Sequence, residues 1–458
     1  MRLRSATALV VANIIGAGIF TTTGFQAADL GHPGYIYLLW IAGGVLALAG
    51  ALCYAELGAA IPEAGAEYVY LRVTYGPALG FMSAFVSLVA GFSAPIAAAV
   101  KSLVRYAQPF VPGLDPGAAL GPVLVEDLVA IGLVWLLVAV HLRGRKGGFA
   151  FNDLMTLLKV AGIVGIIVAA FAVGRGELGR ILEVSPGFAE IAAERRLLPA
   201  MATSLVFVMF CYSGWNAAAY VAAEMRDPQR DLPRSLLYGT LLVVVLYLGL
   251  NVVYFYGAGV EGLAGQVEVG QIAARELFGS VGTAIVTVIL CISIFASASA
   301  MTIAGPRVYY AFGRDFALAH GGEGRGGPLG ALASANPTTG APSRALMLQG
   351  VVTSAVIVSG RVDQIQQYAG FTLTLFASLA VSCVIVLRLR RPDLERPFRT
   401  WGYPVTPLLF LAASAWIMLW AFQGRPVESS LSLLTVAIGG VVFLLLARLG
   451  SRRAQRDR

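Results

Sequence analysis

The sequence predicts an all-α protein that crosses a lipid bilayer many times. Of its 458 residues, 58% are hydrophobic and only 13% are charged, whereas a soluble globular protein has about 25% charged residues. The mean hydropathy is +0.77. Apolar runs of about 20 residues, the length that spans a bilayer core, recur along the whole chain. A single soluble core could not bury this much apolar surface.

Twelve apolar stretches are candidate transmembrane helices. The first follows Arg2 and Arg4, as a signal peptide would, but it is too long and contains Asn13, so we expect a retained span. The twelve stretches are 5–28, 35–61, 78–108, 123–142, 150–174, 199–224, 235–258, 280–303, 344–360, 365–388, 404–422 and 429–449.

The basic residues predict how the chain is oriented. With the N-terminus in the cytoplasm, most of the 33 Lys and Arg residues fall in cytoplasmic segments, which is the usual bias of membrane proteins. We therefore expect a multi-pass protein of the plasma (inner) membrane with both termini in the cytoplasm. The longest polar segment, 304–343, is rich in glycine and is expected to be a flexible cytoplasmic loop.

Several function classes are disfavoured by the composition. The net charge is +8, but no basic stripe carries interleaved aromatic residues, so lipid contact is expected and nucleic-acid binding is not. The 4 cysteines form no CxxC pair and the 3 histidines lie far apart, so neither a metal site nor a cofactor is expected. A membrane-embedded enzyme would need a catalytic motif, and a channel a repeated filter; neither is evident.

Glycine lies beside polar residues at mid-depth in two of the stretches. The first stretch contains Gly16 and Gly18, and the sixth contains Ser213, Gly214 and Asn216. Unwound backbone in a membrane is tolerated only where it is buried or lines a cavity. Two interrupted spans at corresponding positions are typical of a transporter site between inverted repeats. The alternative is that these glycines only allow close helix packing.

The breaks lie in the first and the sixth of the twelve predicted spans. This spacing predicts two five-helix repeats followed by two extra helices. The predicted units are 1–174 for the first repeat, 199–388 for the inverted second repeat, 404–449 for the two additional helices and 450–458 for a cytoplasmic tail. A half-helix that begins at mid-membrane offers unpaired N–H groups to a carboxylate, and one that ends there offers carbonyls to an ammonium group. An α-amino acid carries both groups.

Four sequence motifs resemble those of the amino acid–polyamine–organocation superfamily, in particular the bacterial amino acid permeases and L-type amino acid transporters. Residues 14–20 resemble the family's GSGIF motif, and residues 62–72 its PxxGGxYxYLR loop. Residues 213–216, with the glutamate and prolines that follow, resemble its sixth-span block, and residues 396–399 its RPF(K/R) signature. The resemblance implies the LeuT-type fold, with helices 1 and 6 unwound, and amino acids or small amines as substrates.

The resemblance also implies a substrate site. The carboxylate would meet backbone at Ala17 and Gly18, where Ala17 replaces the serine usual in the family, and Phe210 would be an aromatic gate. The amino group would meet carbonyls, and Trp215 and Asn216 would line the pocket. The implied residues are Ile14, Ala17, Gly18, Phe210, Cys211, Ser213, Trp215 and Asn216, with helix breaks at Gly16, Gly18 and Gly214.

Three lysines occur in the chain, and two of them lie inside predicted spans. Lys159 is about nine residues inside its stretch, and an ionisable group there is a functional candidate. The resemblance implies that Lys159 replaces a sodium ion, facing first-span carbonyls and the hydroxyls of Ser297 or Ser299. It would either carry a proton or stay charged as a brace; snorkelling is the alternative. Lys101 is nearer a span end and is expected to snorkel outward.

Acidic residues near the cytoplasmic ends of spans form a possible inner gate. Glu56, Asp153 and Glu224 could pair with Arg72, Arg226 or Arg307, or they could simply be solvated. The function predicted from the whole sequence is sodium-independent transport of small or medium neutral amino acids, by proton symport or by exchange. A cationic amino acid or polyamine exchanger of the same superfamily is the alternative.

Overall fold

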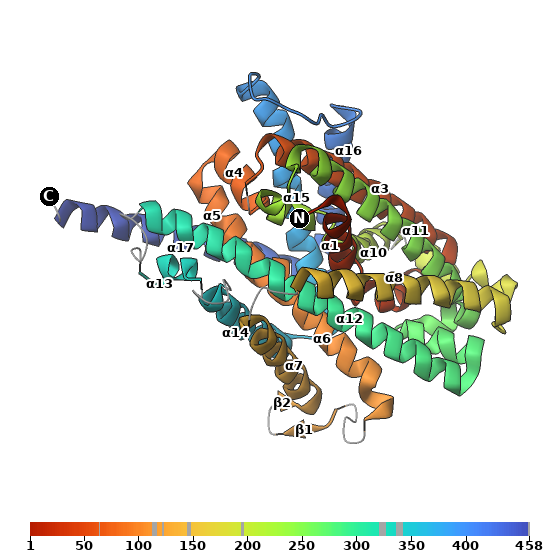
Figure 1. Cartoon of the computed structure of the whole chain (residues 1–458). Coiled ribbons are helices and arrows are strands. Elements are labelled where there is room, and N and C mark those ends of the chain that lie inside the picture. Colours follow the sequence, from red (N-terminus) through yellow and green to blue (C-terminus); the bar gives the residue numbers. More distant parts are fainter. Residues whose placement is uncertain are drawn as a thin grey trace.

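The computed structural model describes residues 1–63, 65–111, 117–120, 123–143, 148–193, 197–319, 327–335 and 342–456. These residues form a bundle of long helices, with α1 at its centre (Figure 1). The α-helices are α1 Leu3–Ile14, α2 Thr22–Leu30, α3 Pro33–Ala60, α4 Glu67–Tyr75, α5 Pro77–Val86, α6 Ala94–Ala107, α7 Val125–Leu142, α8 Gly148–Val173, α9 Phe188–Ala193, α10 Leu197–Tyr212, α11 Pro228–Leu263, α12 Val269–Ala319, α13 Gly327–Gly330, α14 Ser343–Ser359, α15 Val362–Arg390, α16 Val405–Gly424 and α17 Pro426–Arg456.

Shorter elements connect or interrupt these helices. They are the 3-10 helices η1 Gly18–Phe20, η3 Gln108–Phe110, η4 Leu178–Ile181, η5 Ala217–Glu224 and η6 Ala331–Ala333, and the π-helix η2 Ser87–Ser93. Two strands of two residues each, β1 Ala119–Leu120 and β2 Val123–Leu124, form an antiparallel pair between α6 and α7. Apart from this pair, the regular structure of the described residues is helical, as the sequence predicts.

Ten helical segments are long and apolar enough to cross a membrane, and two shorter apolar helices, α1 and α14, lie at the first and ninth predicted stretches. Each of the other ten predicted stretches overlaps one of the ten segments. Many large apolar side chains on these helices are exposed, among them Leu157, Val168 and Val281. A helix with such a surface is stable in lipid. The molecule is therefore a multi-pass membrane protein.

The segment 304–343 differs from the expected loop. α12 continues as a helix to Ala319, with a break in helical geometry only at Gly279, and α13 and η6 follow within the same segment. The helix persists because its C-terminal end packs against α5 and η6. The glycine-rich stretch 321–326 lies outside the described residues, as do Ala64 of the 62–72 motif and the 457–458 end of the predicted tail.

Lys101 does not snorkel as expected. Its side chain is only 7% exposed, it pairs with Asp127 of α7, and its ammonium group donates to the backbone carbonyl of Ile357 at 3.1 Å. A second pair, Arg105 with Glu126 at 2.9 Å, lies one turn away. These pairs tie α6, α7 and α14 together, because a buried ammonium group is stable only with a partner of opposite charge or several hydrogen bonds.

Candidate functional site

The first break in the bundle lies between α1 and α2. α1 ends at Ile14, and Ile15 leaves helical geometry with φ −72° and ψ 89°. Gly16 and Gly18 follow directly, and the chain resumes as η1 and then α2. The last carbonyls of a helix have no partner within it, and away from water they must be satisfied by other groups. The end of α1 therefore needs donors from neighbouring helices.

Lys159 of α8 supplies one set of these donors. Its ammonium group donates to the carbonyl oxygens of Ile15 at 2.7 Å and Ala12 at 3.2 Å, and its side chain is 1% exposed. The C-terminal end of a helix carries partial negative charge, which attracts a cation. Within the described residues Lys159 has no ion pair with a carboxylate. It is a cation held by the broken helix itself.

Tyr247 of α11 is a second donor, and the sequence reasoning missed it. Its buried hydroxyl lies 2.7 Å from the carbonyl oxygen of Ile14 and 3.1 Å from that of Cys211, at the end of α10. A hydroxyl has one proton to donate, so it can serve either carbonyl but not both at once. Tyr247 thus connects the ends of the two helices that the sequence predicts to be interrupted.

The second break lies between α10 and η5, and it touches the first. Gly214 has φ +100°, a conformation that favours glycine, and a Cβ atom there would lie 2.8 Å from the backbone of Asn13. A Cβ atom on Gly18 would lie 2.6 Å from the Sγ atom of Cys211. The glycines at both breaks therefore have a shared structural reason: they let two interrupted backbones pack in direct contact.

The restart of the first helix leaves backbone donors unused. The amides of Phe20 and Thr21 donate to the carbonyls of Ala17 and Gly18, at 3.0 and 3.1 Å. Within the described residues no hydrogen bond is formed by the backbone amides of Ala17 and Gly18 themselves. Unpaired N–H groups at the start of a helical segment favour an anion.

A cavity of about 60 Å³ lies beside the second break. Of the predicted site residues, Ser213, Trp215 and Asn216 line it, together with Gly214, whereas Ile14, Ala17, Gly18, Phe210 and Cys211 do not. The π-helix η2 contributes Gly91, and π-helices often occur at functional sites. The cavity is smaller than a typical ligand pocket of several hundred cubic ångströms, so the helices are packed closely around the breaks.

Glu67 of α4 adds a carboxylate to this cavity. Its oxygens accept hydrogen bonds from Tyr54 at 2.8 Å, from the Asn216 amide at 2.6 Å and from Tyr220. Within the described residues no cation pairs with it. The substrate site implied by the sequence contains no charged residue, and Glu67 was not singled out because it lies in the 62–72 motif, which was interpreted as a loop.

The two serines implied as partners of Lys159 lie in different surroundings. The Ser297 hydroxyl is buried and has no hydrogen-bond partner among the residues that the structure describes, and it lies 3.2 Å from where a Cβ atom on Gly16 would be. Ser299 lies 3.0 Å from the Nε2 atom of His141 in α7. Neither hydroxyl forms a hydrogen bond with Lys159. The two hydrogen bonds of the lysine go to the carbonyls of Ala12 in α1 and of Ile15 directly after it.

The proposed gate residues form separate ion pairs. Glu224 of η5 pairs with Arg307 of α12 at 3.1 Å, which is one of the combinations expected from the sequence. Arg72 of α4 instead pairs with Asp315 of α12 and with Glu63 at 3.2 Å. The Glu224–Arg307 and Arg72–Asp315 pairs join α12 to η5 and to α4.

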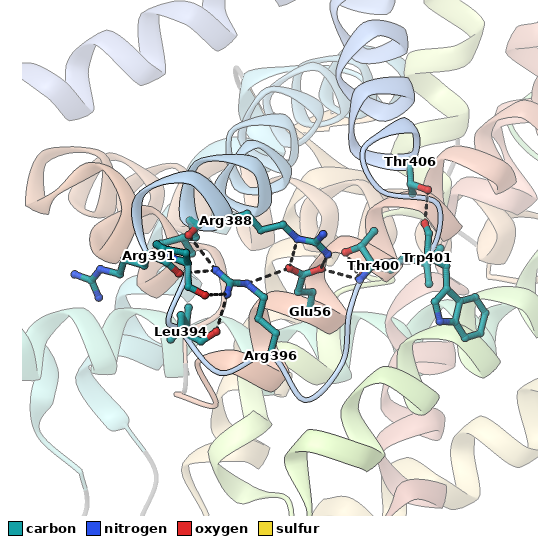
Figure 2. Close-up of polar contacts among 11 residues, drawn as sticks. Glu56, Arg388, Arg391, Leu394, Arg396, Thr400, Trp401 and Thr406 are labelled. Atoms are coloured by element: carbon teal, nitrogen blue, oxygen red, sulfur yellow. Dashed lines mark hydrogen bonds and ion pairs between the residues drawn. The ribbon is translucent and has the colours of Figure 1, made fainter.

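Glu56, near the C-terminal end of α3, pairs with none of the arginines expected from the sequence. Its carboxylate accepts from Arg388 at 2.6 and 2.8 Å and from the Thr400 amide at 2.7 Å, and Arg396 lies 3.5 Å away (Figure 2). Arg396 also donates to backbone carbonyls at the end of α15. The 396–399 motif therefore fixes the loop between α15 and α16 onto α3.

No group of three or more His, Cys, Asp or Glu side chains that could hold a metal lies among the residues that the structure describes.

A many-helix membrane bundle with two touching helix breaks is the architecture of a transporter rather than of a soluble enzyme. A sequence model of the amino acid permease family matches residues 2–443. The chain belongs to this family, as its four motifs predict, and is an amino acid permease, not an enzyme.

Two relatives show how far the similarity extends. The human (Homo sapiens) b(0,+)-type amino acid transporter 1 is 28% identical over 449 residues, covering 97% of this chain and 87% of the relative. The mouse (Mus musculus) Large neutral amino acids transporter small subunit 2 is 26% identical over 445 residues, covering 97% and 80%. The similarity therefore extends over almost the whole chain.

Proposed function

We propose that this permease carries neutral amino acids across the plasma membrane without sodium, by alternating access. The observation that carries the proposal is the set of contacts of Lys159 with the carbonyls of Ala12 and Ile15. These carbonyls are the kind of oxygen ligand that a sodium ion would use, and a built-in ammonium group already occupies them. A transporter with this arrangement needs no sodium site at this position.

The twelve-helix, LeuT-type interpretation is part of the same proposal. The breaks occur in the first and sixth predicted spans, and they contact each other at Gly214 and Gly18. Each predicted repeat consists of five spans, of which the broken span is the first, and α16 and α17 are then the two extra helices. Both termini are placed in the cytoplasm, since the basic residues gather on that side.

The substrate's two charged groups have complementary partners at the breaks. Its carboxylate would be held by the free amides of Ala17 and Gly18, with no arginine required. Its ammonium group would face the carbonyls of Ile14, Phe210 and Cys211. Those of Ile14 and Cys211 each have a lone pair beyond the bond to the Tyr247 hydroxyl. Phe210 would cover the substrate, and Ser213, Trp215 and Asn216 would contact its side chain.

Exchange is the mode that the contacts of Lys159 support better. The two carbonyl acceptors at the end of α1 favour the ammonium form of Lys159. In that form it would act as a brace for the broken helix, and proton symport through Lys159 is the alternative. Neutral substrates are supported by the uncharged contacts around the breaks and by the large neutral amino acids named for the mouse relative.

Cationic amino acids are a second candidate substrate class, because Glu67 brings one carboxylate to the cavity. A cationic side chain that extended from the breaks toward Asn216 would approach it. The three hydrogen bonds that Glu67 already accepts are the reason for preferring the neutral class.

Counterflow in proteoliposomes tests the proposal directly. Vesicles loaded with unlabelled leucine should accumulate labelled leucine equally well in sodium and in choline buffers, and the uptake should saturate. Unlabelled lysine and unlabelled isoleucine, added outside, distinguish the two substrate classes. Uptake that requires sodium, or that shows no trans-stimulation, would contradict sodium-independent exchange.

A further inference from the structure

A groove of about 540 Å³ opens on the surface between the start of α11 and the loop that precedes α16. It lies away from the helix breaks, beside the Glu56 network of Figure 2. Its walls carry two arginines from α11 and two aromatic residues from the loop. The lining residues are Asp227, Gln229, Arg230, Pro233, Arg234, Leu237, Tyr238, Pro397, Phe398 and Trp401.

The two arginines of the groove are available to a ligand. Arg230 and Arg234 are one helical turn apart and exposed, and within the described residues neither guanidinium group forms an ion pair or a hydrogen bond. Asp227 is the one acid among the lining residues, and its carboxylate caps the helix by accepting from the Arg230 backbone amide at 3.3 Å. The groove therefore has a net positive charge that suits an anion.

The α11 wall changes from basic to aromatic to aliphatic along its length. Arg230, Arg234, Tyr238, Leu241 and Val245 follow at intervals of three or four residues, which places them on one helix face. Tyr238 is 56% exposed, Leu241 53% and Val245 60%. The order matches that of a phospholipid: a charged headgroup, an interfacial region and a hydrocarbon chain.

The opposite wall changes from aromatic to aliphatic in the same direction. Trp401 is 63% exposed and lies beside Phe398, with 6.0 Å between ring centroids, and the exposed Val405 and Leu408 follow on α16. α3 packs against both α11 and α16 (Figure 1). The groove thus continues into an apolar surface of the kind that faces lipid tails.

The loop that forms this wall is held in place. Glu56 at the end of α3 accepts from the Thr400 amide and from Arg388, and Thr406 donates to the Trp401 carbonyl at 2.5 Å (Figure 2). A wall fixed by buried charge-assisted hydrogen bonds presents its aromatic residues without a large ordering cost on binding.

We propose that this groove is a binding site for one anionic glycerophospholipid, whose phosphate lies between Arg230 and Arg234. The glycerol region would lie against Tyr238 and Trp401, and one acyl chain would follow Leu241 and Leu408. A zwitterionic lipid offers the same tails but places a cation beside the arginines, so it binds more weakly.

Native mass spectrometry of the full-length protein tests the proposal. Detergent micelles are doped with dioleoyl phosphatidylglycerol or dioleoyl phosphatidylcholine, and the retained lipids are counted. We expect the wild-type protein to retain one phosphatidylglycerol in preference to phosphatidylcholine. The double variant Arg230→Gln/Arg234→Gln should weaken this binding about thirtyfold, since each basic residue near an anionic surface contributes about fivefold.

The matched control removes the same charge outside the groove. Arg226 and Arg399 are exposed neighbours that do not line it, so Arg226→Gln/Arg399→Gln should retain phosphatidylglycerol. Trp401→Ala, which keeps every charge, should weaken retention of both lipids. Equal losses in the two double variants would overturn the proposal in favour of diffuse attraction. Displacement of the lipid by inorganic phosphate at moderate concentration would overturn it in favour of a free-anion site.

Discussion

Two of the regions of this permease that bury charged residues satisfy those charges in different ways. In the scaffold formed by α6, α7 and α14, Lys101 pairs with Asp127 and Arg105 pairs with Glu126. At the helix breaks, Lys159 and Glu67 have no oppositely charged partner within the described residues. Backbone carbonyls satisfy the lysine, and tyrosine and asparagine side chains satisfy the glutamate.

This difference matches the task of each region. Separating a buried ion pair leaves two uncompensated charges in a medium of low dielectric constant, so paired charges hold helices in one arrangement. A hydrogen bond to a neutral group is worth less and can be exchanged for another. Segments that change partners during alternating access are therefore better served by lone charges with neutral partners, and a fixed scaffold by ion pairs.

The largest expected effect is that of Lys159→Met. The substitution keeps much of the side-chain volume but leaves two buried carbonyls without donors, each at a cost of about 1–3 kcal/mol. We expect leucine counterflow to fall at least about thirtyfold while the protein still inserts and elutes as a single species. The measurement is initial uptake in proteoliposomes at equal protein density.

Lys159→Arg is the control that keeps the charge. It should retain more counterflow than Lys159→Met, although the larger guanidinium group fits the site less well. If Lys159→Met transported leucine normally and with wild-type dependence on pH, both the brace and the proton-carrier interpretations would be wrong.

Lys101→Met should act mainly on stability. It leaves Asp127 buried without a cation, and breaking a buried pair costs about 3–5 kcal/mol. The double variant Lys101→Met/Asp127→Leu removes both charges and should recover most of this loss. Thermal unfolding in detergent reports the stability, and counterflow per folded molecule should stay near the wild-type value. A transport defect in the double variant would contradict the assignment of this pair to the scaffold.

The general architecture could be predicted from the sequence because hydrophobic length and glycine position are local signals. Each predicted stretch coincides with a helix or a broken helix, and the breaks occur at the glycines singled out, Gly16 to Gly18 and Gly214. The family could be predicted because four of its short motifs can be read directly from the sequence. The end of α12 at Ala319 was missed because it depends on packing against α5 and η6, which no local pattern reports.

The partners of the buried charges could not be predicted, since they come from segments distant in the sequence. Lys101 of α6 pairs with Asp127 of α7, and Glu56 of α3 pairs with Arg388 of α15. Tyr247 of α11 contacts carbonyls at both breaks. Glu67 carried a signal that could have been used: it stands in an apolar, aromatic-rich sequence within a motif. An acid in such surroundings is expected to be buried and hydrogen-bonded.

Tyr247→Phe tests the connection between the two breaks. It removes a hydroxyl that serves the carbonyls of Ile14 and Cys211 and changes little else in the ring packing. The loss of one buried hydrogen bond is worth about 1 kcal/mol, so we expect counterflow to fall about fivefold to tenfold. Tyr254→Phe is the matched control, because the Tyr254 hydroxyl is buried on the same helix but has no hydrogen-bond partner in the described part of the chain. Equal effects of the two variants would contradict a specific connection.

The smallest effect is expected for Glu67→Gln. This variant tests most directly what a buried charge without an oppositely charged partner does at the breaks. The glutamine keeps the shape and one carbonyl acceptor, and its amide can donate to a tyrosine hydroxyl, so most hydrogen bonds to Tyr54 and Tyr220 can be kept. If the carboxylate serves only to hold α3, α4 and η5 together, leucine counterflow should stay within about threefold of wild type. The ratio of leucine to lysine competition should also be unchanged.

Glu67→Ala gives the contrast that makes this result informative. It leaves Tyr54, Tyr220 and Asn216 without their shared acceptor, so counterflow should fall further than in Glu67→Gln, by about tenfold. A different outcome, in which Glu67→Gln abolishes lysine competition and spares leucine, would show that the lone carboxylate receives a cationic side chain. The charge at the second break would then be part of substrate recognition, whereas Lys159 at the first break would remain part of the structure that moves.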